Sequence, residues 1–300
     1  MTSTATNLSA PAMPTMRPNP LVDFWNQTLA AKFIRYRHVL VGGLSRHSEA
    51  VLPAVNVQPG SRVLDVGCGF GDTAILLADR TGPTGEVVGI DCCDAFLELA
   101  REDARSGGVR NVRFVSGDVE QGVHDDPFDF VFSRFGTMFF SNPVAGLRAI
   151  HRSLKPGGQL AHIVWRGRAD NPWLNEAHTI VRRFLPAPGE GALSCGPGPF
   201  SMADEASTRA KMEAAGFTDI AFTRVDAKVL IGRDVADAIE FQLALGPAGE
   251  TYREAGPLAD EKRPEIVAAL TELFDESEAG EGGLWMDSSS WLVTARPNTH

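Results

Sequence analysis

A glycine-rich turn follows a predicted buried strand and opens a predicted helix. The short apolar run 61–66 predicts the strand, and residues 73–80 predict the helix. Between them, glycines occupy alternate positions from Gly67 to Gly71. Glycines at such a turn let the backbone approach a ligand, because no side chain blocks the way. Asp65 lies just before the turn, where a carboxylate would repel a pyrophosphate but suits a ligand with ammonium and sulfonium charges.

Two more acidic residues follow the next predicted strands. Asp91 ends the strand predicted at 86–90, where an acid can accept hydrogen bonds from both hydroxyls of a ribose. Asp118 lies just past the strand predicted at 112–115, where it could accept a hydrogen bond from the amino group of an adenine. The carboxyl ends of parallel strands share one edge of a sheet, so these acids and Asp65 converge on the crevice there.

Strands alternate with helices through the first half of the chain. Further strands are predicted at 128–133 and 159–165, and helices at 95–105 and 143–154. This alternation implies parallel βαβ units in a doubly wound α/β sheet.

The second half departs from strict alternation. A capping box of Ser201 and Asp204 predicts a helix over 201–215. The remaining predicted elements are a strand at 225–231, helices at 234–245 and 260–278, and a strand at 284–295.

The N-terminal segment changes composition at Leu21. Residues 1–20 are rich in Thr, Ser, Ala and Pro and lack the pattern of a secretory signal, so we predict a disordered tail. Apolar residues at steps of three and four from Leu21 to Leu40 predict an amphipathic helix.

Composition excludes several function classes. The formal net charge of −10, without a Lys/Arg run, disfavours nucleic acid as a partner. No apolar stretch reaches the roughly 20 residues of a membrane-spanning helix. The four cysteines do not resemble a disulfide framework, which predicts a cytoplasmic protein. No His/Asp/Glu cluster has metal-ligand spacing, so we predict no metal.

The motifs together resemble those of the class I S-adenosylmethionine-dependent methyltransferases, over about residues 51–170. A further pattern, Ser133–Phe140 with Asn171–Trp173, resembles a small-molecule subgroup related to the ubiquinone/menaquinone-biosynthesis methyltransferases. The segments that carry the family resemblance are Val63–Asp72, Val87–Asp91, Ser116–Val119 and Leu154–Gly158.

The resemblance implies a Rossmann-like, doubly wound sheet of seven strands with the last strand antiparallel. It also implies an N-terminal helical cap and a helical insertion before the last strand. We therefore expect a tail at 1–20, a cap at 21–50, a cofactor-binding core at 51–170, and a C-terminal part at 171–300 with an insertion at about 232–282.

The activity that the resemblance implies is methyl transfer from S-adenosylmethionine to an oxygen, nitrogen or carbon of a small molecule. Asp65 and the glycines would hold the methionine part, Asp91 the ribose and Asp118 the adenine amino group. Cys92 would lie beside the adenine, although cysteine departs from the usual apolar residue there. The implied cofactor-binding residues are Asp65, Gly67, Cys68, Gly69, Asp91, Cys92, Asp118, Val119 and Ser133.

Aromatic residues after the fourth and fifth strands predict a small acceptor that is apolar or aromatic. Arg134 could instead select an anionic acceptor, or be a structural salt-bridge partner. Whether a general base takes part stays open, because the sulfonium is already a strong methyl donor. The candidate substrate residues are Trp25, Tyr36, Arg134, Phe135 and Trp173, and the candidate catalytic residues are His38, His162 and Arg134.

Two other functions stay open at this point. One is a protein that binds S-adenosylmethionine without catalysis, and the other is a nicotinamide-dependent oxidoreductase. The glycine spacing and Asp65 disfavour the second. A homodimer is a further possibility.

Overall fold

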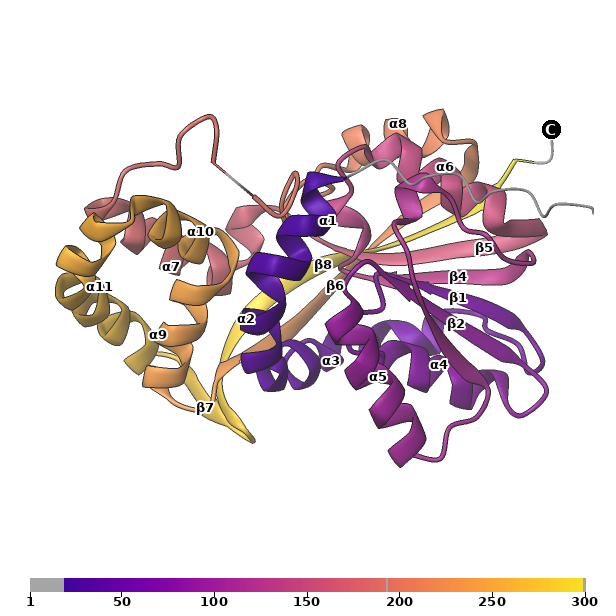
Figure 1. The fold of residues 1–300 in the computed structure, drawn as a ribbon, viewed down its shortest axis with the longest axis horizontal. Coiled ribbons are helices and arrows are strands. Elements are labelled where there is room, and N and C mark those ends of the chain that lie inside the picture. Colours follow the sequence, from indigo (N-terminus) through magenta and orange to yellow (C-terminus); the bar gives the residue numbers. More distant parts are fainter. Residues whose placement is uncertain (1–18, 193, 299–300) are drawn as a thin grey trace, which may run out of the picture.

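The centre of the fold is a sheet whose first five strands run parallel (Figure 1). The structure is a computed structural model and describes residues 19–192 and 194–298. The strand order is β3-β2-β1-β4-β5-β8-β6, and a short β7 pairs with β8. The strands are β1 (Arg62–Val66), β2 (Glu86–Asp91), β3 (Val112–Ser116), β4 (Phe128–Arg134), β5 (Leu154–Trp165), β6 (Phe217–Gly232), β7 (Glu278–Gly280) and β8 (Gly283–Pro297).

The last strand is reversed, as the sequence predicts. β8 pairs antiparallel with both β5 and β6, so it runs against the other six strands of the main path. The predicted doubly wound α/β fold with an antiparallel last strand is therefore confirmed. The sequence did not predict β7, which is three residues long.

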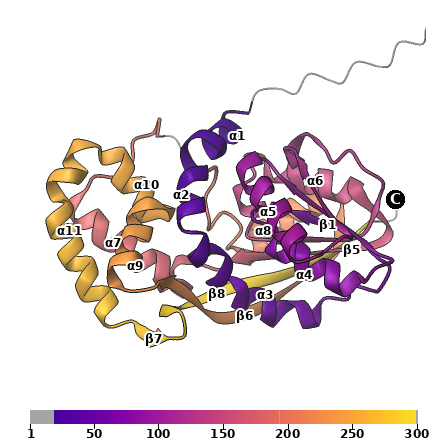
Figure 2. The same cartoon turned by 60° about the horizontal axis from the view of Figure 1, so that its bottom comes forward.

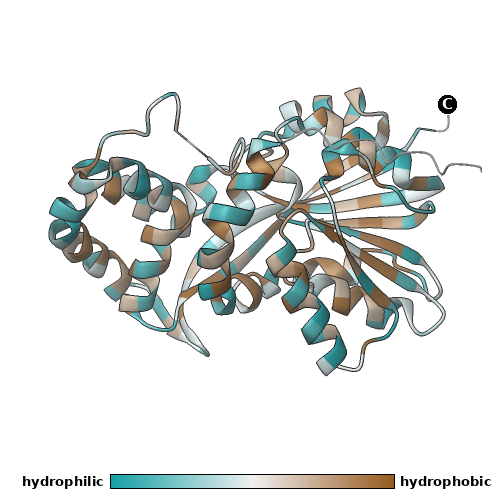
Figure 3. Ribbon diagram, in the orientation of Figure 1, coloured by the Kyte–Doolittle hydropathy of each residue, from teal (hydrophilic) through white to brown (hydrophobic). Residues whose placement is uncertain are grey.

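The inner strands are apolar on both faces. Val63, Leu64 and Val66 of β1 are completely buried, and hydrophobic residues dominate the strands in Figure 3. This pattern is typical of a parallel sheet that is covered by helices on both sides.

Helices cover both faces of the sheet. In Figure 1, α4 (Asp72–Thr81) and α5 (Asp94–Ser106) lie on one side, while α6 (Pro143–Ser153) and α8 (Glu205–Ala214) lie on the other. Asn142 caps α6, because its side-chain oxygen accepts a hydrogen bond from the Ala145 N–H. Because the helices change side at β1, the chain leaves a crevice beside the carboxyl end of this strand.

The predicted start of α8 is wrong by four residues. Asp204 caps the helix through the Ser207 N–H, and the helix proper begins at Glu205. Ser201 does not act as the cap, because its hydroxyl donates to the Met138 carbonyl oxygen, 2.6 Å away.

The N-terminal helices form a cap in front of the sheet (Figure 2). The single helix predicted from Leu21 to Leu40 is divided into α1 (Pro20–Phe24) and α2 (Ala30–Arg35), and α3 (Ser45–Val51), which was not predicted, follows them. π-Helical turns lie between them at Trp25–Leu29 and His38–Gly42. The tail predicted at 1–20 lies mostly outside the described residues, which begin at residue 19.

A group of helices lies beyond the cap, away from the sheet (Figures 1 and 2). Between β6 and β8 the sequence predicts two helices, but the structure has three. No helix is predicted between residues 245 and 260, yet Pro247 and Pro257 each lie in the first turn of a helix. The group consists of α7 (Pro172–Phe184), α9 (Val235–Ala244), α10 (Gly246–Ala255) and α11 (Pro257–Asp275).

Short 3₁₀ turns join several elements. They lie at Leu52–Ala54, Val119–Gln121, Thr137–Phe139 and Arg168–Asp170.

No helix in residues 19–192 and 194–298 is long and apolar enough to cross a membrane.

Candidate functional site

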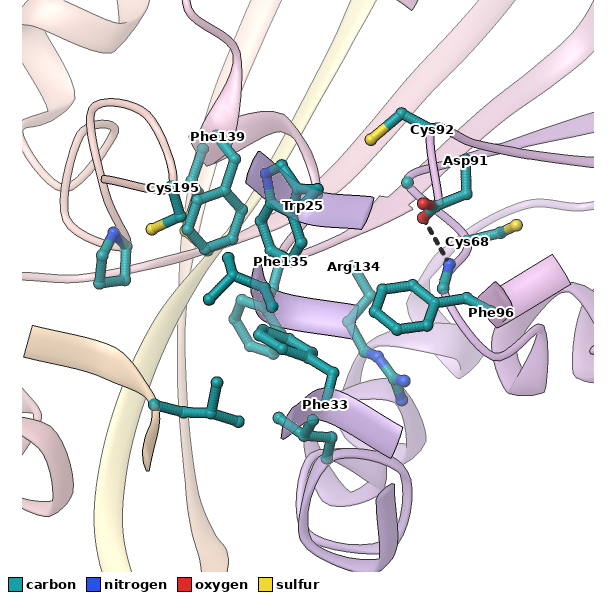
Figure 4. A pocket seen from close by; sticks show the side chains of 18 of the residues that line it. Trp25, Phe33, Cys68, Asp91, Cys92, Phe96, Arg134, Phe135, Phe139 and Cys195 are labelled. Carbon is teal, nitrogen blue, oxygen red and sulfur yellow. Dashed lines mark hydrogen bonds between the residues drawn. The ribbon is translucent and has the colours of Figure 1, made fainter. Parts of the chain in front are cut away.

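A cavity of about 290 Å³ lies at the carboxyl ends of β1, β2 and β4, under the cap helices. Figure 4 shows Asp91 and Cys92 on one side and Phe139 and Cys195 on the other, with Trp25 and Phe135 between them. The cavity therefore has a polar end beside the glycine turn and an apolar end beside the helices beyond the cap. This is the crevice that the strand order of a doubly wound sheet creates.

The glycine turn after β1 forms one wall of the polar end. Gly67 and Gly69 have φ values of +64° and +52°, a region that favours glycine. A Cβ at Gly67 would lie 2.9 Å from the Cα of Gly136, so the turns after β1 and β4 approach backbone to backbone. At Gly69 no described atom lies within 4 Å of the Cβ position, which leaves space for a ligand beside the backbone.

Asp91 ends β2 and lines the cavity. Its Oδ2 accepts a hydrogen bond from the Gly69 N–H at 2.8 Å, and its Oδ1 accepts one from the Cys93 N–H at 2.9 Å. Burial raises the pKa of this carboxyl, and the hydrogen bonds from Cys93 and Gly69 oppose the rise. The carboxylate is thus fixed against the glycine turn and faces the same space.

Asp118 lies at the same end of the cavity, together with Cys92 and Val119. Its Oδ2 accepts a hydrogen bond from the Asn19 amide at 2.8 Å, and its Oδ1 caps the next turn through the Glu120 N–H. The Cys92 carbonyl accepts a hydrogen bond from the Asn26 amide at 2.8 Å. The cap is therefore bonded to the polar end at two places.

Two of the predicted cofactor residues lie beneath the cavity rather than on its wall. Asp65 is completely buried, and its Oδ2 accepts a hydrogen bond from the Thr73 hydroxyl at 2.6 Å. Its Oδ1 has no hydrogen-bond partner in the part of the chain that the structure describes. Burial raises the pKa of Asp65 to about 7. Ser133 is also buried, and its hydroxyl donates to the Val66 carbonyl.

Arg134 lines the cavity and is held by two partners. Its guanidinium lies 2.7 Å from the Asp72 carboxylate at the start of α4, and it donates to the Ser48 hydroxyl at 3.1 Å. The structure therefore shows one of the roles left open for Arg134, that of a salt-bridge partner. A role in binding or catalysis stays a prediction.

Phe135 and Trp165 form a stacked pair in the apolar end. Their ring centroids are 3.8 Å apart and their planes are 13° apart. Phe135 has a φ of +58°, which is rare for a bulky residue. His47 packs edge-on against both rings and is held by the Ser288 and Ser290 hydroxyls. Burial lowers the pKa of His47 to about 4, so the ring under the stack is neutral at pH 7.

The other predicted substrate residues fall into two groups. Trp25 and Trp173 line the cavity. Trp25 packs edge-on against Phe33 and Phe139, with ring centroids 5.1 and 5.3 Å apart. Tyr36 is 2% exposed and packs against Phe241, outside the cavity lining. The structure thus brings Trp25, Trp173, Arg134 and Phe135 together and leaves Tyr36 in the core.

The two candidate histidines do not line the cavity. The Nε2 of His38 lies 2.7 Å from the Asp237 carboxylate of α9 and so ties the cap to the helices beyond it. His162 is completely buried, and its Nδ1 lies 2.9 Å from the Thr137 hydroxyl oxygen. Burial lowers the pKa of His162 to about 4.

Residues 58–178 match the family model described as "Methyltransferase domain". This stretch runs from before β1 into α7 and contains the whole polar end of the cavity except Asn19 and the cap.

Residues 58–178 are thus similar to a methyltransferase domain, the name used for them below.

Two curated relatives are similar to a part of this chain. The "Ubiquinone/menaquinone biosynthesis C-methyltransferase" of Ectopseudomonas mendocina is 36% identical over 167 residues, which are 54% of this chain and 65% of that protein. The "Demethylmenaquinone methyltransferase" of Listeria welshimeri is 39% identical over 137 residues, 45% of this chain and 58% of that protein. The chain thus spans less than two thirds of the length of either relative.

A solved structure shares the fold of the methyltransferase domain and of the parts around it. It is phosphoethanolamine N-methyltransferase 2 of Haemonchus contortus, in complex with S-adenosyl-L-methionine. The TM-score is 0.54 at 18% identity, over 93% of this chain and 60% of that one.

Several cavity residues that sequence reasoning missed lie outside the methyltransferase domain. Glu250 and Arg253 lie on α10, and Cys195 lies in the segment after α7. Leu245 and Pro247 complete this wall. On α10 the lining residues follow helical spacing, a signal that becomes readable only once the helix itself is known.

Proposed function

We propose that this chain is an S-adenosylmethionine-dependent methyltransferase that acts on a small apolar or aromatic molecule. The observation that carries the proposal is one continuous cavity, in which Asp91 and the glycine turn face an aromatic wall. The methyltransferase domain and its relatives support the reaction class.

The residues at the polar end fit the cofactor. Gly69 leaves free space beside its backbone, and Asp91 offers carboxylate oxygens to a ribose. Asp118 and Cys92 would border the adenine, and Gly67 the methionine part. S-Adenosylmethionine supplies, when bound, a methyl group on a positively charged sulfur. The carboxylates of Asp91, Asp118 and Glu120 around this end favour a cation, whereas that of Asp72 is paired with Arg134.

The residues at the apolar end suit the acceptor. Trp25, Phe135, Phe139, Trp165 and Trp173 line it, and such side chains give contact area and exclude water. The names of the curated relatives support a quinone-type ring as the acceptor. Holding the acceptor in line with the methyl group contributes to the rate by itself, so a buried neutral histidine such as His162 need not act as a base.

A calorimetric titration followed by a turnover assay tests the proposal. We expect S-adenosylmethionine and S-adenosylhomocysteine to bind with one site, and NADH and NADPH not to bind. Incubation with methyl-labelled donor and a panel of hydroquinones and phenols should give a labelled product. Binding of NADPH in place of S-adenosylmethionine would overturn the proposal, and binding without turnover on any acceptor would favour a non-catalytic role.

Three further statements are part of the proposal. We expect a cytoplasmic protein, supported by cysteines that are free among the described residues. We expect no nucleic-acid partner, supported by the net charge of −10. A homodimer stays a possibility, and the division into tail, cap, core and C-terminal part stays a prediction.

A further inference from the structure

Glu250 differs from the other carboxylates of the cavity, because each of the others has a partner. Asp72 pairs with Arg134, and Asp91 accepts two backbone N–H groups. Asp118 accepts from Asn19, and Glu120 accepts from the Ser141 and Asn142 N–H groups. The Glu250 carboxylate has no hydrogen bond or ion pair within residues 19–192 and 194–298.

The surroundings of Glu250 are mostly apolar. It is half-buried on the cavity face of α10, which also presents Pro247. Burial raises the pKa of Glu250, and the Arg253 guanidinium one turn away opposes the rise. Burial also raises the pKa of the Cys195 thiol to about 12, and the charge of Glu250 adds to this rise. Carboxylate and thiol therefore share the apolar end.

A half-buried carboxylate without a partner is unfavourable, because it has lost water and gained no donor. Such a group becomes favourable when a ligand brings a hydrogen-bond donor to it. An anionic ligand would be repelled by Glu250. The Arg253 guanidinium on the same face of α10 is paired with Glu254, 2.9 Å away, so the aromatic wall rather than Arg253 argues for a neutral ligand. The hydroxyl of an aromatic ring is a neutral donor that suits both this wall and Glu250.

We propose that the Glu250 carboxylate binds a hydroxyl group of the methyl acceptor, and that the acceptor is a neutral hydroxylated aromatic such as a phenol or hydroquinone. This inference rests on the proposed function, since it assigns the apolar end of that same cavity to the acceptor. The aromatic rings of Phe135 and Trp25 would contact the acceptor ring, while Glu250 fixes its orientation.

Two probes separate the hydroxyl from the ring that carries it. 2-Naphthol and naphthalene have the same ring system, and naphthalene lacks the hydroxyl. Binding of both is measured by fluorescence to wild type, Glu250→Gln and Glu272→Gln, each saturated with S-adenosylhomocysteine. Glu272 is exposed on α11 and outside the cavity lining, so its variant is the matched control.

We expect Glu250→Gln to weaken the binding of 2-naphthol at least about tenfold and to leave the binding of naphthalene unchanged. Glu272→Gln should bind both probes like wild type. An equal loss for both probes would show that Glu250 acts only by shaping the cavity, and would overturn the proposal. Unchanged 2-naphthol binding, or no binding of either probe to wild type, would also overturn it.

Cofactor binding is measured separately, so that the two proposals fail separately. If wild type does not bind S-adenosylhomocysteine, the proposed function fails, whereas the naphthol comparison still reports on Glu250 in the protein alone. If S-adenosylhomocysteine binds equally to all three proteins and only the naphthol comparison fails, the proposed function is retained and the proposed role of Glu250 is wrong.

Discussion

The Arg134 guanidinium and the Asp72 carboxylate form an ion pair of 2.7 Å on the wall of the cavity, where the Arg134 side chain is only 9% exposed. Arg134 is the last residue of β4 and Asp72 the first of α4, so this pair connects the end of β4 to the helix after β1. An anionic acceptor would have to compete with Asp72 for the guanidinium. The pair therefore argues against Arg134 as a free anion-binding group.

We expect Arg134→Ala to lower the free energy of unfolding by on the order of 2–3 kcal/mol, because it leaves the Asp72 carboxylate without its partner. Urea denaturation measures this loss. The double variant Arg134→Ala, Asp72→Asn should recover part of it. A double variant as unstable as the sum of the single ones would contradict the role of the pair.

Phe135→Ala removes half of the aromatic stack. We expect it to weaken the binding of both naphthalene and 2-naphthol several-fold, because the variant loses a contact to the ring and not one to the hydroxyl. Cofactor binding should stay near the wild-type value. A variant that binds both probes like wild type would show that the stack serves only the packing against Trp165.

Asp91→Ala tests the assignment of the ribose. We expect it to weaken S-adenosylmethionine at least about tenfold in calorimetry, because hydrogen bonds to a charged acceptor are lost. Asp79→Ala, an exposed change on α4, is the control and should bind normally. If the Asp91 variant binds S-adenosylmethionine as tightly as wild type, Asp91 does not bind the ribose.

Gly136→Ala tests the backbone contact between the two turns. Gly136 has an ordinary helical φ, so any effect of a Cβ is steric. That Cβ would lie 2.8 Å from the Val66 carbonyl oxygen and 3.1 Å from the Gly67 Cα. We expect a loss of about 1–3 kcal/mol in stability and weaker cofactor binding. Gly42→Ala, which meets no described atom within 4 Å, should change neither; equal behaviour of the two variants would refute the contact's importance.

The protonation of Asp65 should make stability depend on pH. Its pKa is about 7 in the folded chain, above its ordinary value, mainly because of burial. Between these pKa values the folded chain holds a proton that the unfolded chain has released, so the free energy of unfolding falls as pH rises through the window.

We expect the free energy of unfolding of wild type, minus that of Asp65→Asn, to fall by on the order of 2–4 kcal/mol from about pH 5 to about pH 8. Denaturant titrations without cofactor at both pH values measure it. Asp79→Asn should show no such change relative to wild type. A difference that is constant with pH, or that grows, would mean that Asp65 is ionised in the folded chain.

The polar end of the site could be predicted because its residues sit at fixed places on local motifs. Asp91 ends a strand and Gly67 and Asp118 follow one, and the parallel order of the strands brings these positions to one edge. The parallel strands β1 to β5 were predictable as well, since each carries its own apolar residues, whereas β7 is short and exposed.

Only part of the apolar end could be predicted. Trp25, Phe135 and Trp173 were candidates from the sequence, but the wall on α10 comes from an element distant in sequence. Glu250 reaches the cavity only through the packing of α10 against α7 and α9. The Gly-Pro pairs around that helix also look like loops. Tyr36 shows the converse: helical spacing places it among apolar residues but does not tell a cavity wall from the core.

The chain leaves β6 at Gly232 and enters β8 at Gly283, next to each other on paired strands. A Cβ at Gly283 would collide with the backbone of Gly232 and Arg233, so the exit and the return lie in contact. Residues 233–282 are thus a cassette with adjoining ends, and replacing it would leave the strand register intact. Relatives could then diverge in the molecules they modify by exchanging one contiguous stretch of gene, while the half proposed to bind the methyl donor evolves under separate constraints.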